Sequence, residues 1–346
     1  MELGVGGLPN RPLMEAAAGQ GASGAGEGQR PTPPPLPLGV RLQLAGLTAA
    51  IDAVERSDGT VNRCLYSVID RLLSARANPR PDGSGVRSYD FTVDASRGIW
   101  ARVFAPVSSE VPLPVIVYYH AGGFALFSPA IGPFNGVCRR LCSDVGAVVV
   151  SVNYRLAPEH RYPAAYDDGV DALRFIDDAG GIRASATAFH RWAAEHQPAA
   201  KSLRLAGIIP VQPYFGGEER TESELRLEGV APVVNLERSD FSWKAFLPVG
   251  ATRDHPAAHV TDENAELADD FPPTLLVIGG FDPLQDWQRR YADVLRRKGV
   301  KVQVAEYPDG FHGFYGFPVA DAGKVFREMK AFVESNRVAP AESTAR

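Results

Sequence analysis

The chain has 346 residues, of which 45% are hydrophobic and 22% charged, an ordinary composition for a soluble globular protein of one large domain or two small ones. Its net charge of −5 and sequence pI near 5.9 give no reason to expect a nucleic-acid partner. No apolar run approaches the roughly 20 residues that span a membrane, and the N-terminus lacks the basic start and apolar core of a signal peptide. We therefore expect a cytoplasmic protein without a membrane span, with the nucleus as an additional location.

Composition and periodicity divide the chain into a tail, one domain and a short second tail. Residues 1–38 are rich in glycine, alanine and proline and cannot bury enough apolar surface to offset the entropy of ordering, so we expect a disordered tail. Residues 39–338 form the expected domain. Apolar side chains at helical spacing within residues 39–75 predict two helices that form an N-terminal cap. Residues 339–346 are the expected second tail.

After a turn-rich link at residues 78–85, strands and helices alternate. Continuous apolar runs such as PVIVYY at 114–119 are typical of strands buried on both faces of a sheet. The alternation predicts an α/β fold with a mostly parallel sheet that carries helices on both faces. The expected strands are 98–104, 114–119, 147–152, 203–211, 273–278 and 300–307. The expected helices are 40–53, 61–73, 135–145, 164–177, 286–298 and 322–335.

A glycine-rich loop directly follows the expected strand at 114–119. It begins at His120 and reads HAGGF. Glycines let a backbone approach a substrate closely, and backbone N–H groups that point into a cleft can stabilise the oxyanion of acyl transfer. Gly122 and Gly123 are the expected donors, and a glycine turn without chemistry is the alternative. The loop resembles the HGGG-type oxyanion loop of esterases and lipases, with alanine in place of the first glycine.

Two further motifs carry a family resemblance. Residues 151–159 read SVNYRLAPE and residues 162–168 read YPAAYDD. They resemble the hormone-sensitive-lipase-like esterases, and most closely the plant carboxylesterases and the related gibberellin receptors. The resemblance implies an α/β-hydrolase fold and a carboxylesterase-type serine hydrolase that binds a small-molecule ester or another hydrophobic ligand. Within these motifs we expect structural roles, including an ion pair between Arg155 and Glu159.

Two loops near the C-terminus match the acid and base positions of the same family. Residues 279–284 read GGFDPL after an expected strand, and residues 307–314 read YPDGFHGF. The resemblance implies that Asp282 is the triad acid and His312 the general base. A carboxylate beside an imidazole holds the correct tautomer and stabilises its protonated form. The alternative is an aspartate in a turn and a partly buried histidine.

The nucleophile is the missing part of this constellation. The family carries its serine in a G-x-S-x-G elbow, which should lie between residues 162–168 and the strand at 203–211. No serine in the chain has glycine at both −2 and +2. Ser185 and Ser202 are the only serines in the expected window, and Ser185, in the sequence RASAT, lacks the glycines that the sharp turn needs. We therefore assign no nucleophile.

The gap extends beyond one residue. Between residues 178 and 203 the family has a loop, a buried strand, the elbow and a helix, whereas here residues 189–196 resemble only the end of that helix. This pattern indicates a block deletion, with a skipped or wrongly assigned segment as the favoured cause. A buried strand of about six residues contributes on the order of 10 kcal/mol of apolar burial, comparable with the roughly 5–15 kcal/mol net stability of a domain. We expect the chain to be unstable or reorganised at this position.

Three functions remain open at this stage: an impaired carboxylesterase, a non-catalytic binder of a gibberellin-like small molecule, and a defective gene product. The gibberellin receptors keep the serine and lose the histidine, the reverse of this chain, which argues against close equivalence. The aromatic residues Trp243, Phe246 and 314–317 are candidates for an apolar pocket, although we expect core packing. The three cysteines form no CxxC pair and the histidines no HExxH pair, so we expect no metal site and no cofactor. The pattern does not indicate an oligomeric state.

Overall fold

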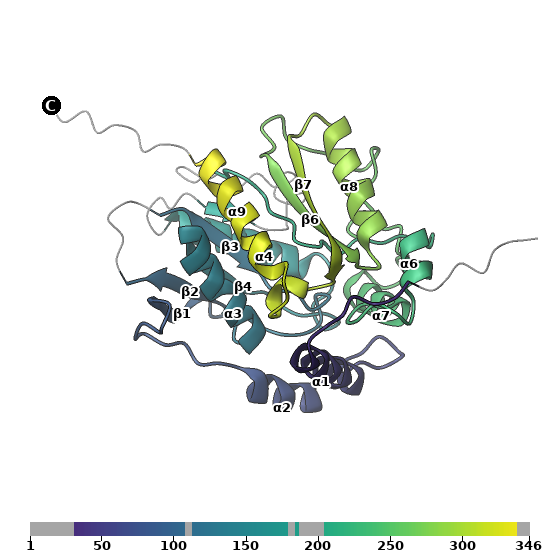
Figure 1. Ribbon diagram of the computed structural model, residues 1–346, viewed down its shortest axis with the longest axis horizontal. Helices are drawn as coiled ribbons and strands as arrows, with labels where there is room; N and C mark the ends of the chain where they lie inside the picture. Colours follow the sequence, from purple (N-terminus) through teal and green to yellow (C-terminus); the bar gives the residue numbers. More distant parts are fainter. Residues whose placement is uncertain (1–30, 108–112, 179–183, 187–203, 338–346) are drawn as a thin grey trace, which may run out of the picture. The chain divides into compact units, whose positions relative to one another are not determined.

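The computed structural model in Figure 1 describes residues 31–107, 113–178, 184–186 and 204–337. Most of the expected N-terminal tail, the expected tail at 339–346 and the helix remnant at 189–196 lie outside the described residues.

The strands form a five-stranded sheet and a two-stranded sheet. In the larger sheet the order is β1-β2-β4-β3-β5, with β1 and β2 antiparallel to their neighbours and β4, β3 and β5 mutually parallel. The smaller sheet pairs β6 with β7 in parallel. The strands are β1 (Val86–Asp94), β2 (Ile99–Pro106), β3 (Val115–Tyr119), β4 (Val148–Asn153), β5 (Ala184–Ala186), β6 (Thr274–Phe281) and β7 (Val302–Phe311).

All six expected helices are confirmed to within a few residues, although the one expected at 135–145 begins earlier and ends in a π-helical turn. The helices are α1 (Leu38–Val54), α2 (Arg63–Leu73), α3 (Gly132–Arg140), the π-helical η1 (Leu141–Gly146), α4 (Ala164–Asp178), α6 (Glu222–Leu227), α7 (Leu236–Phe246), α8 (Gln285–Arg297), the 3₁₀ turn η2 (Phe314–Gly316) and α9 (Ala322–Asn336). Strand β1 and helices α6 and α7 were not expected from the sequence.

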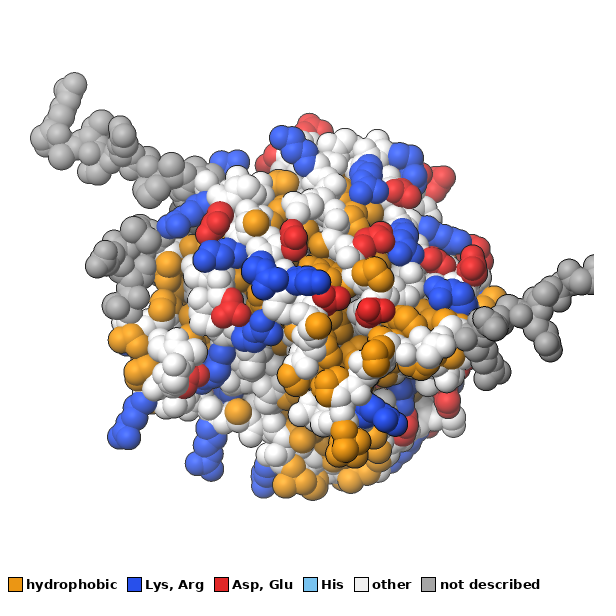
Figure 2. Space-filling model, viewed as in Figure 1, with side chains coloured by type: hydrophobic (Ala, Val, Ile, Leu, Met, Phe, Trp, Pro, Cys, Tyr) orange, Lys and Arg blue, Asp and Glu red, His pale blue; other side chains and the backbone are white. Residues whose placement is uncertain are grey.

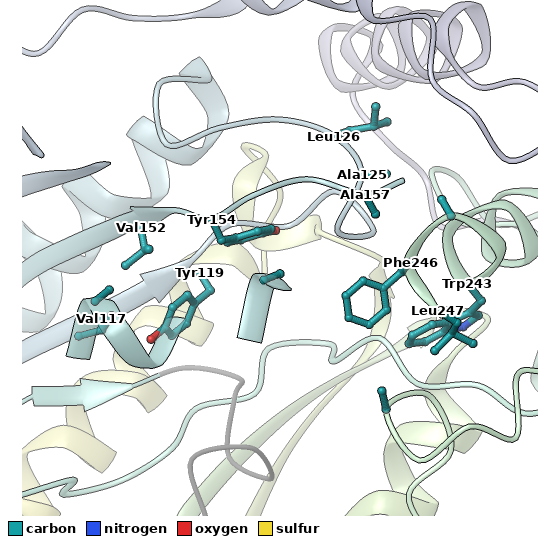
Figure 3. Packing of buried hydrophobic residues seen from close by; sticks show 14 of the residues in the cluster. Val117, Tyr119, Ala125, Leu126, Val152, Tyr154, Ala157, Trp243, Phe246 and Leu247 are labelled. Atoms are coloured by element: carbon teal, nitrogen blue, oxygen red, sulfur yellow. The ribbon is translucent and has the colours of Figure 1, made fainter. Parts of the chain in front are cut away.

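Helices cover both faces of the larger sheet, as the apolar strands predict. Successive side chains of a strand point to opposite faces. Val117 and Tyr119 of β3 pack with Val152 of β4 in a core that also includes α4 and α7 residues (Figure 3). Ile116 and Tyr118 belong to the opposite core, which includes residues of α3, η1 and α9. A third core joins β6 to α8.

Helices α1 and α2 lie in the region where the sequence predicts an N-terminal cap. Helix α2 begins at a capped N-terminus, where the side chain of Asn62 accepts a hydrogen bond from the Leu65 N–H at 3.3 Å. Both helices expose large apolar side chains, and Figure 2 shows such side chains gathered on the lower part of this view, where Figure 1 places the cap. No helix in the described part of the chain is long and apolar enough to cross a membrane.

The prediction of a strand at 203–211 was wrong. This segment runs beside β6, but it forms only isolated bridges from Ile208 to Thr274 and from Val211 to Val277. Its hydrogen bonds with β6 include the Leu275 N–H donating to the Ile208 carbonyl at 2.9 Å. Pro210 has no N–H to donate, so the ladder is interrupted at its centre.

Strand β5 occupies the position beside β3 with only three residues. Ala184, Ser185 and Ala186 pair with Val115, Ile116 and Val117. The larger sheet therefore ends, within the described residues, in a strand that pairs with three of the five residues of β3.

Candidate active site

Asp282 and His312 lie together at the ends of the paired strands β6 and β7. Two glycines at the end of β6 allow this close approach. A Cβ atom on Gly279 would contact the Gly310 carbonyl, and one on Gly280 would lie 2.9 Å from the carbonyl carbon of Pro308. The register of the strands shifts here, so that Phe281 pairs with Phe311 and both strands end directly before the two candidate residues.

The imidazole of His312 is bonded to the carboxylate of Asp282. The distance between His312 Nδ1 and Asp282 Oδ2 is 2.9 Å, and Asp282 is fully buried. The same oxygen accepts hydrogen bonds from Gln212 Nε2 at 3.1 Å and Gln288 Nε2 at 2.9 Å, while Oδ1 accepts one from the Leu284 N–H at 3.0 Å. Four donors satisfy the buried carboxylate as an acceptor.

This arrangement fixes the proton on one nitrogen of His312. Because a carboxylate accepts from Nδ1, the neutral ring carries its proton there and leaves Nε2 unprotonated. Nε2 makes no hydrogen bond to the described residues, and the His312 side chain is 15% exposed. Nε2 is therefore the nitrogen that could accept a proton from a nucleophile.

The glycine-rich loop adopts backbone conformations that other residues rarely take. Gly122 has φ +126° and Gly123 has φ +58°. The Gly122 carbonyl accepts the N–H groups of Ala125 and Leu126 at 3.1 and 3.0 Å, which closes a tight turn. The N–H groups of Gly122 and Gly123 make no hydrogen bond to other described residues, so both remain available as donors.

Two residues that the sequence did not single out connect the glycine loop with His312. Ser242 of α7 lies against Gly123, where an added Cβ would come 3.0 Å from the Ser242 Cβ. Tyr214 lies close to Ser242 and Ser239, and its ring meets the His312 ring edge-on at 6.0 Å between centroids. Burial raises the pKa of Tyr214 to about 12, so its hydroxyl stays protonated at neutral pH.

His120 supports the loop from the core. Its ring stacks on Tyr154 at 4.2 Å between centroids and is only 3% exposed. Its Nδ1 lies 3.0 Å from the Ala121 carbonyl, and the Tyr154 hydroxyl donates to the His120 carbonyl at 2.6 Å. Burial lowers the pKa of His120 to about 4, so it is neutral at physiological pH. The first residue of the motif therefore anchors the loop.

Helix α2 of the cap holds the segment after the glycines. Arg63 Nη1 donates to the Ala125 carbonyl at 2.8 Å, and the Tyr66 side chain lies close to the backbone of Phe127. Just beyond α2, the Ala75 N–H donates to the Ala130 carbonyl at 2.7 Å. The cap and the glycine loop thus form one connected unit.

The predicted ion pair between Arg155 and Glu159 was wrong. Arg155 Nη2 lies 2.8 Å from Oδ1 of the fully buried Asp168, and the Arg155 N–H donates to Oδ2 of Asp168 at 2.8 Å. Glu159 instead pairs with Arg63, and its Oε1 accepts from Arg63 Nε at 2.9 Å. An unpaired carboxylate costs more free energy when it is buried than when it is exposed. The buried Asp168 therefore binds the guanidinium of Arg155.

Ser185, the described serine of the expected window, does not lie at the end of β3. The backbone of Ser185 pairs with Ile116, three residues before β3 ends at Tyr119. At about 3.3 Å per residue, this position lies on the order of 10 Å short of the strand end where the glycine loop begins. Ser202 lies outside the described residues.

Three of the aromatic residues considered for a pocket are core residues, whereas Tyr315 and Phe317 are only partly buried. Trp243, Phe246 and Phe314 are at most 1% exposed. Among the described residues, no group of three or more histidine, cysteine, aspartate or glutamate side chains could hold a metal ion.

Comparisons with known proteins agree with this arrangement. Residues 116–316 match a family model described as alpha/beta hydrolase fold. Gibberellin receptor GID1C of Arabidopsis thaliana is 36% identical over 323 residues, which cover 84% of this chain and 92% of the receptor. Carboxylesterase 20 of the same plant is 34% identical over 325 residues, covering 83% of this chain and 96% of that protein. An esterase from Pyrobaculum calidifontis matches in structure with a TM-score of 0.64 and 28% identity, covering 88% of this chain and 100% of the esterase.

The fold, the glycine loop and these relatives agree, and the chain belongs to the α/β-hydrolase family, in its branch of plant carboxylesterases and gibberellin receptors.

Proposed function

We propose that this chain is a carboxylesterase-type hydrolase whose catalysis is impaired because it lacks the nucleophilic serine. One observation carries the proposal. Asp282 and His312 form a 2.9 Å hydrogen bond, and the N–H groups of Gly122 and Gly123 make no hydrogen bond to other described residues, yet no serine of the chain stands in a G-x-S-x-G elbow. The residues proposed as acid, base and oxyanion donors are thus present, but the serine that would attack the ester carbonyl is missing.

The chemistry of the complete site defines what is lost. In that site the serine attacks an ester carbonyl, His312 takes the hydroxyl proton at Nε2, and the N–H groups of Gly122 and Gly123 stabilise the oxyanion. Without the serine, no acyl-enzyme forms. Loss of the nucleophile lowers kcat by on the order of 10⁶-fold in the serine hydrolases where it has been measured.

The lengths of the alignments support a missing block. The alignment with the gibberellin receptor is 323 positions long, but it covers only 84% of this 346-residue chain, which is about 291 residues. The alignment therefore contains gaps in this chain. The same holds for Carboxylesterase 20, with 325 residues against 83% of the chain. The short β5 and the absence of an elbow sequence agree with a block lost between residues 178 and 203.

A serine-reactive fluorophosphonate tests the proposal directly. We expect no stoichiometric labelling of the folded chain and no burst of p-nitrophenol from p-nitrophenyl acetate. A Ser185→Ala variant is the matched control, and it should behave like the parent chain. Stoichiometric labelling that Ser185→Ala abolishes would overturn the proposal. Sequencing of transcripts across residues 178–203 adds an independent test, because a transcript with a G-x-S-x-G segment would identify the lost block.

A non-catalytic role as a gibberellin-like binder is the second candidate. It is favoured by the 36% identity to a gibberellin receptor and by the hydrogen bond from Arg63 of α2 to the Ala125 carbonyl after the glycines, which supports a cap that could cover a ligand. Isothermal titration calorimetry with gibberellin decides it. Saturable binding at micromolar ligand would support this role, and no heat at that concentration would exclude it. A chain that fails to melt cooperatively would instead indicate a defective gene product.

A further inference from the structure

Gln212 makes an unusual set of buried hydrogen bonds around the acid–base pair. Its side chain is 3% exposed. Nε2 donates to Asp282 Oδ2 and to the Phe311 carbonyl, both at 3.1 Å, while Oε1 accepts the Gly313 N–H at 2.7 Å. Phe311 and Gly313 are the two chain neighbours of His312. One amide therefore binds the carboxylate and the backbone on both sides of the candidate base.

The chain makes specific room for this amide. A Cβ on Gly279 would lie 2.6 Å from Gln212 Nε2, so only glycine at that position leaves space for the donor. Gln212 itself has φ +46°, a conformation that non-glycine residues rarely adopt. Backbone strain of this kind persists where the surroundings over-determine it, and the three hydrogen bonds of the side chain provide that constraint.

A second glutamine ties the same segment to the carboxylate. Gln288 of α8 is fully buried, and its Nε2 donates to Asp282 Oδ2 at 2.9 Å and to the Pro213 carbonyl at 3.3 Å. The pair is thus braced by the segment 212–213 on one side and by α8 on the other. None of these groups lies between residues 178 and 203, where the nucleophile block is expected.

We infer that Gln212 is a positioning residue for the acid–base pair. It holds the His312 turn against Asp282, keeps the ring proton on Nδ1 and leaves Nε2 free to accept a proton. The inference rests on the proposed role of His312 as the base. It also explains how the pair stays assembled in a chain without the nucleophile.

The tautomer of His312 and the exchange of one amide proton test this role in the full chain. The ¹⁵N chemical shifts of the imidazole distinguish the two tautomers, and His312→Gln assigns the signals. In Gln212→Met, which keeps the length of the side chain but removes its donor and acceptor, we expect His312 to lose its single Nδ1–H tautomer. We also expect the Gly313 amide to exchange about tenfold faster, because its buried acceptor is gone. Gln303→Met is the control, since Gln303 lies exposed on β7.

A second variant separates the two functions of the side chain and covers a failure of Gln212→Met to fold. Gln212→Glu keeps an acceptor for Gly313 but replaces the donor with a carboxylate beside Asp282. We expect Gly313 protection to stay within about twofold, while the ¹⁵N shifts of the His312 ring change, because a second carboxylate beside Asp282 replaces the amide donor. A folded Gln212 variant that retains the ¹⁵N shifts of His312, its single tautomer and the Gly313 protection of the parent would overturn the inference. Fluorophosphonate labelling does not enter this test, so the proposed function and the positioning role can fail separately.

Discussion

Ser242 lies so close to Gly123 that a Cβ on the glycine would stand 3.0 Å from the Cβ of the serine. Gly123 also has φ +58°, where alanine is strained by about 1 kcal/mol. We therefore expect Gly123→Ala to lower the free energy of unfolding by about 2 kcal/mol, since overpacking adds to the strain. Urea denaturation measures the change.

The control for this substitution is Gly136→Ala. Gly136 lies in α3, where an added Cβ would meet no atom within 4 Å, so we expect a gain of about 0.5 kcal/mol. Combining Gly123→Ala with Ser242→Gly should recover part of the loss. Equal effects of the two glycine substitutions would show that α7 does not constrain the loop.

The pair between Arg155 and Asp168 predicts a large cost for removing one charge. Asp168 is fully buried, and the guanidinium lies 2.8 Å from its Oδ1. We expect Asp168→Asn to lower the free energy of unfolding by about 3 kcal/mol, because Arg155 loses its buried partner. Asp144→Asn is the control, since Asp144 pairs with Arg140 at the surface, and its loss should cost below about 0.5 kcal/mol. Similar midpoints in urea for both variants would contradict the assignment.

The sequence predicted those parts of the site that depend on local patterns. Asp282 and His312 each follow a strand, and parallel neighbours bring their carboxyl ends together, so their proximity could be expected before the structure. The same reasoning placed Gly122 and Gly123 at the end of β3. Strand boundaries gave the positions of these residues, whereas the roles expected for them came from the resemblance of the three loops to the esterase family.

Other features depend on contacts that no local pattern encodes. Arg155 and Glu159 lie four residues apart, which led to the prediction of an ion pair. Asp168 is the more deeply buried carboxylate, and it binds the Arg155 guanidinium instead. Pro210 interrupts an apolar run that otherwise reads as a strand. Gln212 precedes a Pro-Tyr-Phe-Gly-Gly sequence, which predicts a loop near the sheet. Its role could not be predicted, because it depends on contacts with Phe311 and Gly313, about a hundred residues later in the chain.

The connection between α2 and the glycine loop predicts a local effect of Arg63. Its guanidinium binds the Ala125 carbonyl at 2.8 Å and pairs with Glu159. We expect Arg63→Ala to speed amide hydrogen exchange across residues 125–130 and to lower the free energy of unfolding by about 1–2 kcal/mol. Arg71→Ala, an exposed change on the same helix, is the control. Unchanged exchange in the loop would show that the cap does not support it.

Glu55, at the end of α1, predicts a pH dependence of stability. Burial raises its pKa from 4.5 to about 7, the nearby Asp52 and Glu237 act in the same direction, and Arg238 opposes them. The folded state therefore holds this proton more tightly than the unfolded state. Stability from Glu55 is fully present below pH 4.5, declines as the pH rises, and is lost above about pH 7.

Glu55→Gln should remove this decline because glutamine carries no titrating proton. We expect the variant to match the parent below pH 4.5 and to exceed its free energy of unfolding by on the order of 1–2 kcal/mol above pH 7, after allowance for solvent screening of a half-buried group. Urea denaturation at pH 4, 6 and 8 measures the difference, with Glu334→Gln on the exposed face of α9 as the control for the change of side chain. The difference in free energy of unfolding between Glu55→Gln and the parent should change with pH. A difference that stays constant from pH 4 to pH 8 would contradict the raised pKa of Glu55.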